Sequence, residues 1–251
     1  MTVLLAYDAS EYNFQSILSI AHTITGLCEL CISHNGHLPM ATPPWPSSRP
    51  SPLVQICHGT PGLLLLLAVA KGNPGLKGYE DSKWDEAMRL GSERVWEEGL
   101  LSKGGGLCHG ITGNAWPWLL LHEKFKGEED RKPTTLYEGE PTSTSQHERL
   151  SADYFLSKAL AFLLAARETQ PSSTDSPYRM PDNPFSLFEG LAGTICAWAE
   201  TCAVVTARLK LLEEEKGVTP KNSHEDGNSA MNRGDILGFP GLGGMGPHGL
   251  L

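Results

Sequence analysis

Apolar side chains recur along most of the chain at the spacing of helix faces. In residues 14–33 the apolar positions of one such face are Phe14, Ile17, Leu18, Ala21, Ile24 and Leu27. The same pattern predicts further helices over residues 62–70, 82–99, 114–125, 152–167 and 193–212. The strict alternation of a strand is nearly absent, and no hairpin signal is found. We therefore expect an all-α protein.

Polar, proline-rich and glycine-rich stretches separate the expected helices. Residues 37–52 contain six prolines and are expected to be extended or turning. Residues 127–150 and 213–236 are polar and charged, and we expect them to be flexible insertions. The whole chain, residues 1–251, is expected to form a single domain interrupted by these insertions.

Composition and charge exclude several classes of partner. The net charge of −9 leaves no basic face for nucleic acid. The longest apolar runs, 63–70 and 195–205, are too short to cross a bilayer, so no transmembrane segment is expected. The first residues lack the basic and apolar regions of a signal peptide. Six cysteines in 251 residues do not form a disulfide scaffold, and we expect a cytoplasmic protein.

One short pattern occurs twice and is partly repeated a third time. It reads Cys57-His58-Gly59-x-x-Gly62 and then Cys108-His109-Gly110-x-x-Gly113, whereas residues 188–193 keep the glycines and carry Phe-Glu before them. Such recurrence predicts a repeated pair of helices. We expect the first glycine to let the chain turn into a helix and the second to allow close approach between helices.

Cys57, Cys108 and His109 are predicted zinc ligands, because two thiolates and one imidazole hold zinc and leave one coordination position open. Adjacent residues of a helix point about 100° apart, so Cys108 and His109 can both bind the ion only from a turn. The alternative is that these side chains are buried cysteines and histidines that cap helices. His58 duplicates His109, and it is a candidate ligand, a candidate acid/base group or a structural histidine.

The other cysteines and two nearby cations have plainer interpretations. Cys28 and Cys31 form a CxxC inside a helical pattern without a second pair, which predicts core packing. Cys196 and Cys202 are likewise expected in the core. Taken alone, Lys103 and Arg179 are expected to be solvated surface charges.

Three segments, residues 54–62, 106–114 and 184–194, resemble the lanthionine synthetase C-like family, and Cys57-His58 resembles its eukaryotic form. The resemblance implies an α/α toroid of seven helical hairpins around a zinc ion held by Cys57, Cys108 and His109. It also implies addition of a thiolate to a dehydroamino acid, which gives a thioether. The implied partners are glutathione or a peptide thiol and a protein or peptide that contains dehydroalanine.

In that family, glutathione contacts correspond here to Lys103 and to the stretch Arg179, Met180, Pro181 and Asp182. This correspondence changes the expectation for both cations from solvated charges to ligand contacts. Glutathione carries two carboxylates, which suit cationic partners.

The chain differs from the family pattern in its length. About four of the seven hairpins fit in this chain, and a His-Gly-x-x-Gly helix expected before Cys57 is absent. We therefore expect roughly the C-terminal half of the toroid, marginal stability and self-association. The alternative function is a non-catalytic fragment or pseudoenzyme that binds zinc and glutathione. A prenyltransferase subunit would need an Asp two residues before a motif cysteine, and a sugar-processing toroid would need paired carboxylates, so both are disfavoured.

Overall fold

The computed structural model describes residues 14–39, 53–101, 103–129, 150–169, 178–179 and 181–215. Within these residues the α-helices are α2 (Phe14–Ser33), α3 (Thr60–Lys71), α4 (Ser82–Glu98), α5 (Ile111–Glu129), α6 (Ala152–Ala165) and α7 (Leu191–Glu215). Two short 3-10 helices are η2 (Pro74–Leu76) and η3 (Ala166–Thr169). This part of the chain contains no strand, so the all-α prediction is confirmed.

Every predicted helix is present, and the differences lie at the ends. Helix α5 continues to Glu129 and α7 to Glu215, so both extend into the first residues of the predicted insertions. An exposed last turn needs no apolar side chain, and for that reason hydrophobic periodicity locates helix ends poorly. The remaining residues of the two insertions, 130–149 and 216–236, lie outside the described residues, as does most of the proline-rich stretch.

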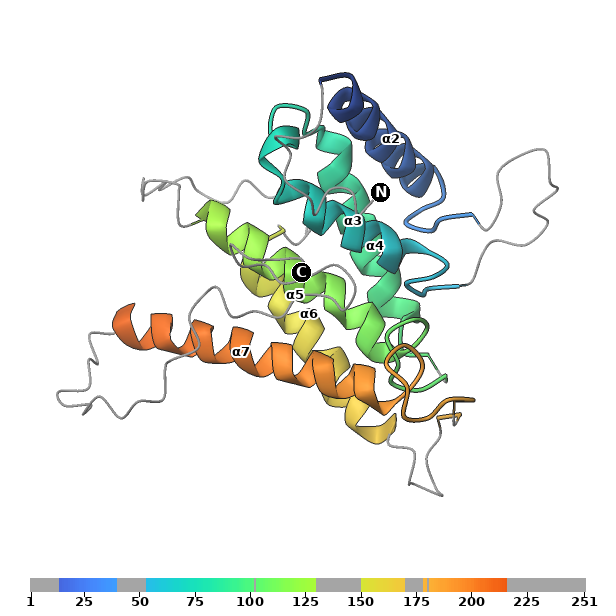
Figure 1. Ribbon diagram of the computed structural model, residues 1–251. Coiled ribbons are helices and arrows are strands. Elements are labelled where there is room, and N and C mark those ends of the chain that lie inside the picture. The colour runs from blue at the N-terminus through green and yellow to red at the C-terminus, as the bar shows by residue number, and fades with distance from the viewer. Residues whose placement is uncertain are drawn as a thin grey trace, which may run out of the picture.

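The helices pack in a layered order, with α5 at the centre. Helix α2 packs on α3 and α4, α3 also contacts α4 and α5, and α5 contacts α6 and α7 (Figure 1). Trp116 and Trp118 of α5 are almost completely buried. The Trp118 ring meets Phe162 edge-on at 5.0 Å, and its Nε1 donates a 3.0 Å hydrogen bond to Ser92 Oγ. The two tryptophans are therefore core residues.

Helix starts alternate between two kinds, as a repeated helix pair requires. Helices α3, α5 and α7 each begin directly after the first glycine of a G-x-x-G segment. Helices α4 and α6 begin instead at side-chain caps, where Asp81 accepts from the N–H of Lys83 and Ser151 accepts from the N–H of Tyr154. The pairs α3–α4 and α5–α6 are thus successive copies of one helical unit, as predicted.

The two glycines of the repeat are needed for close contacts within each loop. Gly59 has a φ of 126°, which confirms the predicted turn into α3. A side chain at Gly62, Gly113 or Gly193 would collide with the carbonyl of the residue six positions earlier. The second glycine therefore lets its own preceding loop fold onto the helix start. The expected approach between two helices was wrong, because the neighbour is a loop.

The cysteines outside the repeat occupy different environments. Cys28 and Cys31 are fully buried, so their predicted core position is confirmed. Cys196 is only partly buried, and Cys202 is exposed beside a pocket between α6 and α7, so the expectation that Cys202 lies in the core was wrong. Helix α7 contacts other described helices mainly through α5 and α6, which leaves side chains such as Ile195 on its outer face exposed.

One helix meets the length and composition of a membrane-crossing segment. The stretch Gln15–Ser33 is long and apolar enough, although a core helix of a soluble protein and a signal sequence pass the same test. Uninterrupted apolar runs did not reveal it, because polar residues are spaced along it. Ile24 and Cys28 on its inner face are fully buried. The expected absence of a transmembrane segment remains a prediction.

Candidate metal centre

Three loops that precede α3, α5 and α7 meet at one place and carry the predicted chemistry. The N–H of Cys57 donates a 3.3 Å hydrogen bond to the carbonyl of Cys108. The N–H of Cys108 donates a 2.7 Å hydrogen bond to the carbonyl of Phe188. Cys108 thus lies between the first and third loops, and backbone bonds fix its position before any metal is considered.

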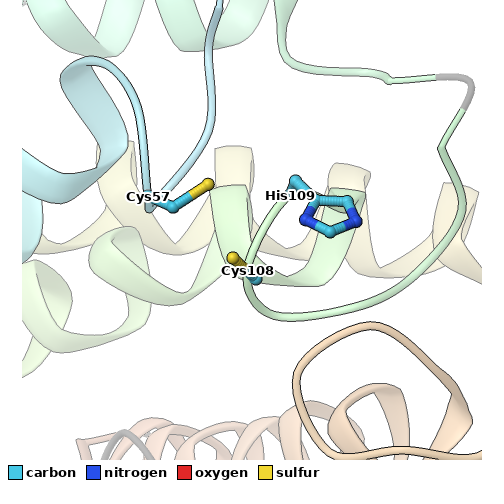
Figure 2. Close-up of side chains that lie close together, drawn as sticks. All are labelled: Cys57, Cys108 and His109. Atoms are coloured by element: carbon cyan, nitrogen blue, oxygen red, sulfur yellow. The ribbon is translucent and has the colours of Figure 1, made fainter. Parts of the chain in front are cut away.

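The predicted ligands lie together. The ligand atoms of Cys57, Cys108 and His109 all lie within 4.8 Å of one another, and Figure 2 shows the three side chains at the meeting point of two loops. Cys108 and His109 belong to a turn before α5, as dual coordination from adjacent residues requires. Cys57 is exposed and the other two are partly buried, so the group is reachable from solvent. It is the one such group of three within the described ranges.

Two buried amides, which the sequence analysis missed, hold the first two loops. The Asn114 amide donates to the carbonyls of Val54, at 2.8 Å, and Gly99, at 2.9 Å. Gln55 is 3% exposed, and its Oε1 accepts a 3.6 Å hydrogen bond from the thiol of Cys57. Asn114 directly follows the second glycine of its motif, and this position is the one sequence signal that could have found it. The amide joins residues 60 positions apart, and no local pattern records that contact.

Threonines tie the second loop to the helices that follow. The hydroxyls of Thr112 and Thr194 both donate to the carbonyl of Gly105, the latter at 2.9 Å. Both side chains are buried. Because Thr194 belongs to α7, this shared carbonyl joins the loop of Cys108 to the third repeat.

The thiol of Cys108 is held in its protonated form when no metal is bound. Burial raises its pKa to about 11, with further contributions from Cys57 and from the negative charge of Glu189, whereas Lys103 acts in the opposite direction. Metal binding at this residue must therefore release a proton, and metal affinity must rise with pH.

The described residues among the predicted glutathione contacts lie near the loop that precedes Cys108 or within it. Lys103 is exposed in the loop before Cys108, and Arg179 and Asp182 are exposed. Pro181 is partly buried, and the main chain of Arg179 lies against Gly104, so the two cationic segments are neighbours. Met180 lies outside the described residues.

His58 does not join the cluster of three. Its side chain is exposed, and its carbonyl accepts a 3.1 Å hydrogen bond from the N–H of Gln55. The structure therefore brings together one imidazole and two thiols. The acid/base role of His58 remains a prediction.

Comparison with known proteins places the chain in a family. Residues 2–204 match the model of a family described as lanthionine synthetase C-like protein. The chain is 34% identical over 161 residues to zebrafish (Danio rerio) "Glutathione S-transferase LANCL1", a match that covers 64% of this chain and 31% of that protein. It is 28% identical over 168 residues to "LanC-like protein GCL1" of Arabidopsis thaliana, covering 65% of this chain and 32% of the relative. The chain thus spans about a third of the length of these relatives.

The family match covers most of the chain and includes all three G-x-x-G loops. The helical architecture is that of the family, whose fold is an α/α toroid. The chain belongs to the lanthionine synthetase C-like family.

Proposed function

We propose that the chain binds one zinc ion through Cys57, Cys108 and His109 and uses it to activate a thiol for addition to a dehydroamino acid. The observation that carries this proposal is the convergence of two thiols and one imidazole within 4.8 Å. Three protein ligands leave a position for a substrate, as in catalytic rather than structural zinc sites.

The donor set fits zinc better than the other common divalent cations. Calcium and magnesium prefer oxygen ligands, whereas thiolate and imidazole suit zinc. The backbone bond between Cys57 and Cys108 and the amide of Asn114 hold the loops in place. Two thiolates would neutralise the charge of the ion, and His109 would add a neutral third donor.

Bound zinc would lower the pKa of a coordinated substrate thiol and so make it a nucleophile at neutral pH. In the addition, sulfur forms a bond to the β-carbon of the dehydroamino acid and the carbon–carbon double bond becomes single. The thiol proton ends on the α-carbon. We assign delivery of that proton to His58, the exposed imidazole next to Cys57.

Glutathione is the proposed thiol, and the name of the zebrafish relative supports it. Lys103 and Arg179 would each give a charge-assisted hydrogen bond to one of its carboxylates, and Met180, Pro181 and Asp182 would complete the contact. All six cysteines are unpaired, which supports a reducing, cytoplasmic location.

The test combines the zinc-loaded chain with glutathione and a peptide that contains one dehydroalanine. Mass spectrometry should show a product heavier by one glutathione, and Cys108→Ala should give none above the uncatalysed rate. Zinc and glutathione binding without product would favour the alternative, a non-catalytic binding module. Absence of both binding and product would refute the proposal.

The cationic contacts can be tested by binding alone. Each charge-assisted hydrogen bond contributes roughly 1.5–3 kcal/mol, so Lys103→Ala or Arg179→Ala should weaken glutathione binding by about tenfold or more. The difference should shrink as salt is added. Unchanged affinity in both variants would remove these residues from the site.

A further inference from the structure

Three charged residues, Lys103, Arg179 and Glu189, belong to segments next to the loop of Cys108 and form no salt bridge with another described residue. Within the described residues, neither Lys103 nor Arg179 forms a salt bridge, and no cation pairs with Glu189. By contrast, Arg89 and Arg94 on α4 each pair with two carboxylates. The charges at the centre are thus available to a ligand that carries both signs.

The main chain of Glu189 lies beside Cys108. Phe188 accepts the 2.7 Å hydrogen bond from the N–H of Cys108, and Glu189 is the next residue. A side chain at Gly106 would collide with the backbone of Glu189, so the second and third loops touch here. In the repeat, Glu189 occupies the position that His58 and His109 hold in the other two copies.

One of the two carboxylate oxygens of Glu189 accepts a hydrogen bond that orients the side chain. The amide of Asn183 donates a 2.7 Å hydrogen bond to its Oε2, and Ser186 Oγ accepts a 3.2 Å hydrogen bond from its N–H. The structure shows no hydrogen bond to the other oxygen from any described residue. The side chain is partly exposed, so this oxygen is open to a ligand.

We propose that Glu189 binds the α-ammonium group of the thiol substrate and selects thiols in which this group is free. This inference rests on the proposed function. Glutathione carries two carboxylates and one ammonium, which matches the two cations and the one carboxylate that form no salt bridge within the described residues. An ammonium donates to the open carboxylate oxygen in a charge-assisted hydrogen bond. A thiol peptide with an acylated amino group has no such donor.

The experiment compares glutathione with N-acetylglutathione, each titrated calorimetrically into zinc-loaded wild type and Glu189→Gln. In the wild type, acetylation should weaken binding about tenfold. Glu189→Gln should weaken glutathione binding by a similar factor, and acetylation should then cost little more. The matched control is Glu213→Gln, which removes an exposed carboxylate about 33 Å along α7 from Leu191 and should leave both affinities unchanged.

Several results would overturn the inference. If Glu189→Gln binds glutathione as the wild type does, or shows the same acetylation penalty, Glu189 does not contact the ammonium and the proposed function stands. If Glu189→Gln loses zinc, the residue acts on the metal. If wild type binds neither thiol, both proposals fail. Should Glu189→Gln misfold, Asn183→Ala, which keeps the carboxylate and removes its orienting donor, must reduce the acetylation penalty.

Discussion

The chain contains two cysteine pairs that differ in burial and in their neighbours. Cys28 and Cys31 lie one turn apart inside α2, fully buried, and burial raises the pKa of each thiol to about 12. Cys57 and Cys108 are 51 residues apart, belong to two loops and lie beside an imidazole with solvent access. The pair that is close in sequence is packed in the core, whereas the pair that is distant in sequence lies within reach of a third metal-ligating group, His109. Exposure and a third donor separate the two pairs better than spacing does.

The largest expected difference between the pairs is in zinc content. Cys108→Ala should abolish binding of about one zinc per chain, because it removes one of three ligands and leaves positive charge uncompensated. Cys31→Ala should retain the metal, because that thiol belongs to the core. Elemental analysis after dialysis measures both. Retained zinc in a variant lacking both Cys57 and Cys108 would remove the site.

Thiol labelling should separate the pairs next. A thiol with a pKa near 12 carries about a thousandfold less thiolate near neutral pH than one at the ordinary value of 9.0. Metal-free protein at pH 8 should therefore be alkylated first at exposed Cys57 and Cys202 and last at Cys28 and Cys31. Peptide mapping by mass spectrometry gives the order. Early labelling of Cys28 would contradict its buried position.

Asn114 joins the loops that carry Cys57 and Cys108. Asn114→Ala removes two buried hydrogen bonds and should lower the free energy of unfolding by about 2–3 kcal/mol. Thr23→Ala, which removes an exposed hydrogen bond on α2, should have little effect by comparison. Urea denaturation of both variants tests this. Equal midpoints for Asn114→Ala and wild type would show that the amide does not hold the loops.

Alkaline pH should lower the free energy of unfolding, because the buried thiols of Cys28 and Cys31 resist ionisation. The unfolded thiols release protons near pH 9, whereas the folded ones retain them to about pH 12, so stability is present below pH 9 and falls above it. The loss should reach about 1 kcal/mol for each thiol by pH 10. Denaturation at pH 8 and pH 10 measures it, and Cys28→Ala should show a smaller loss. A flat profile would mean that the core thiols do not titrate as burial requires.

Sequence patterns predicted the helices and the proximity of Cys57, Cys108 and His109 for different reasons. Helix positions follow from local apolar periodicity, and α2 was predicted with its observed ends. The group of Cys57, Cys108 and His109 followed from the repeat, because equivalent loops of stacked helical units lie at the same end. The two bonds of Asn114 could not be predicted, because they depend on how distant loops meet. Cys202 was misplaced because its apolar sequence neighbours do not reveal which face of α7 is covered.

The central claim is that Cys57, Cys108 and His109 hold one zinc ion with a position left for a thiol. Zinc X-ray absorption of the metal-loaded chain tests it most directly. We expect two sulfur neighbours at about 2.3 Å, the remaining neighbours being nitrogen or oxygen at about 2.0–2.1 Å. Glutathione should add a third sulfur, and Cys57→Ala should remove one. A spectrum without sulfur, or with four sulfur neighbours before any thiol is added, would contradict the account.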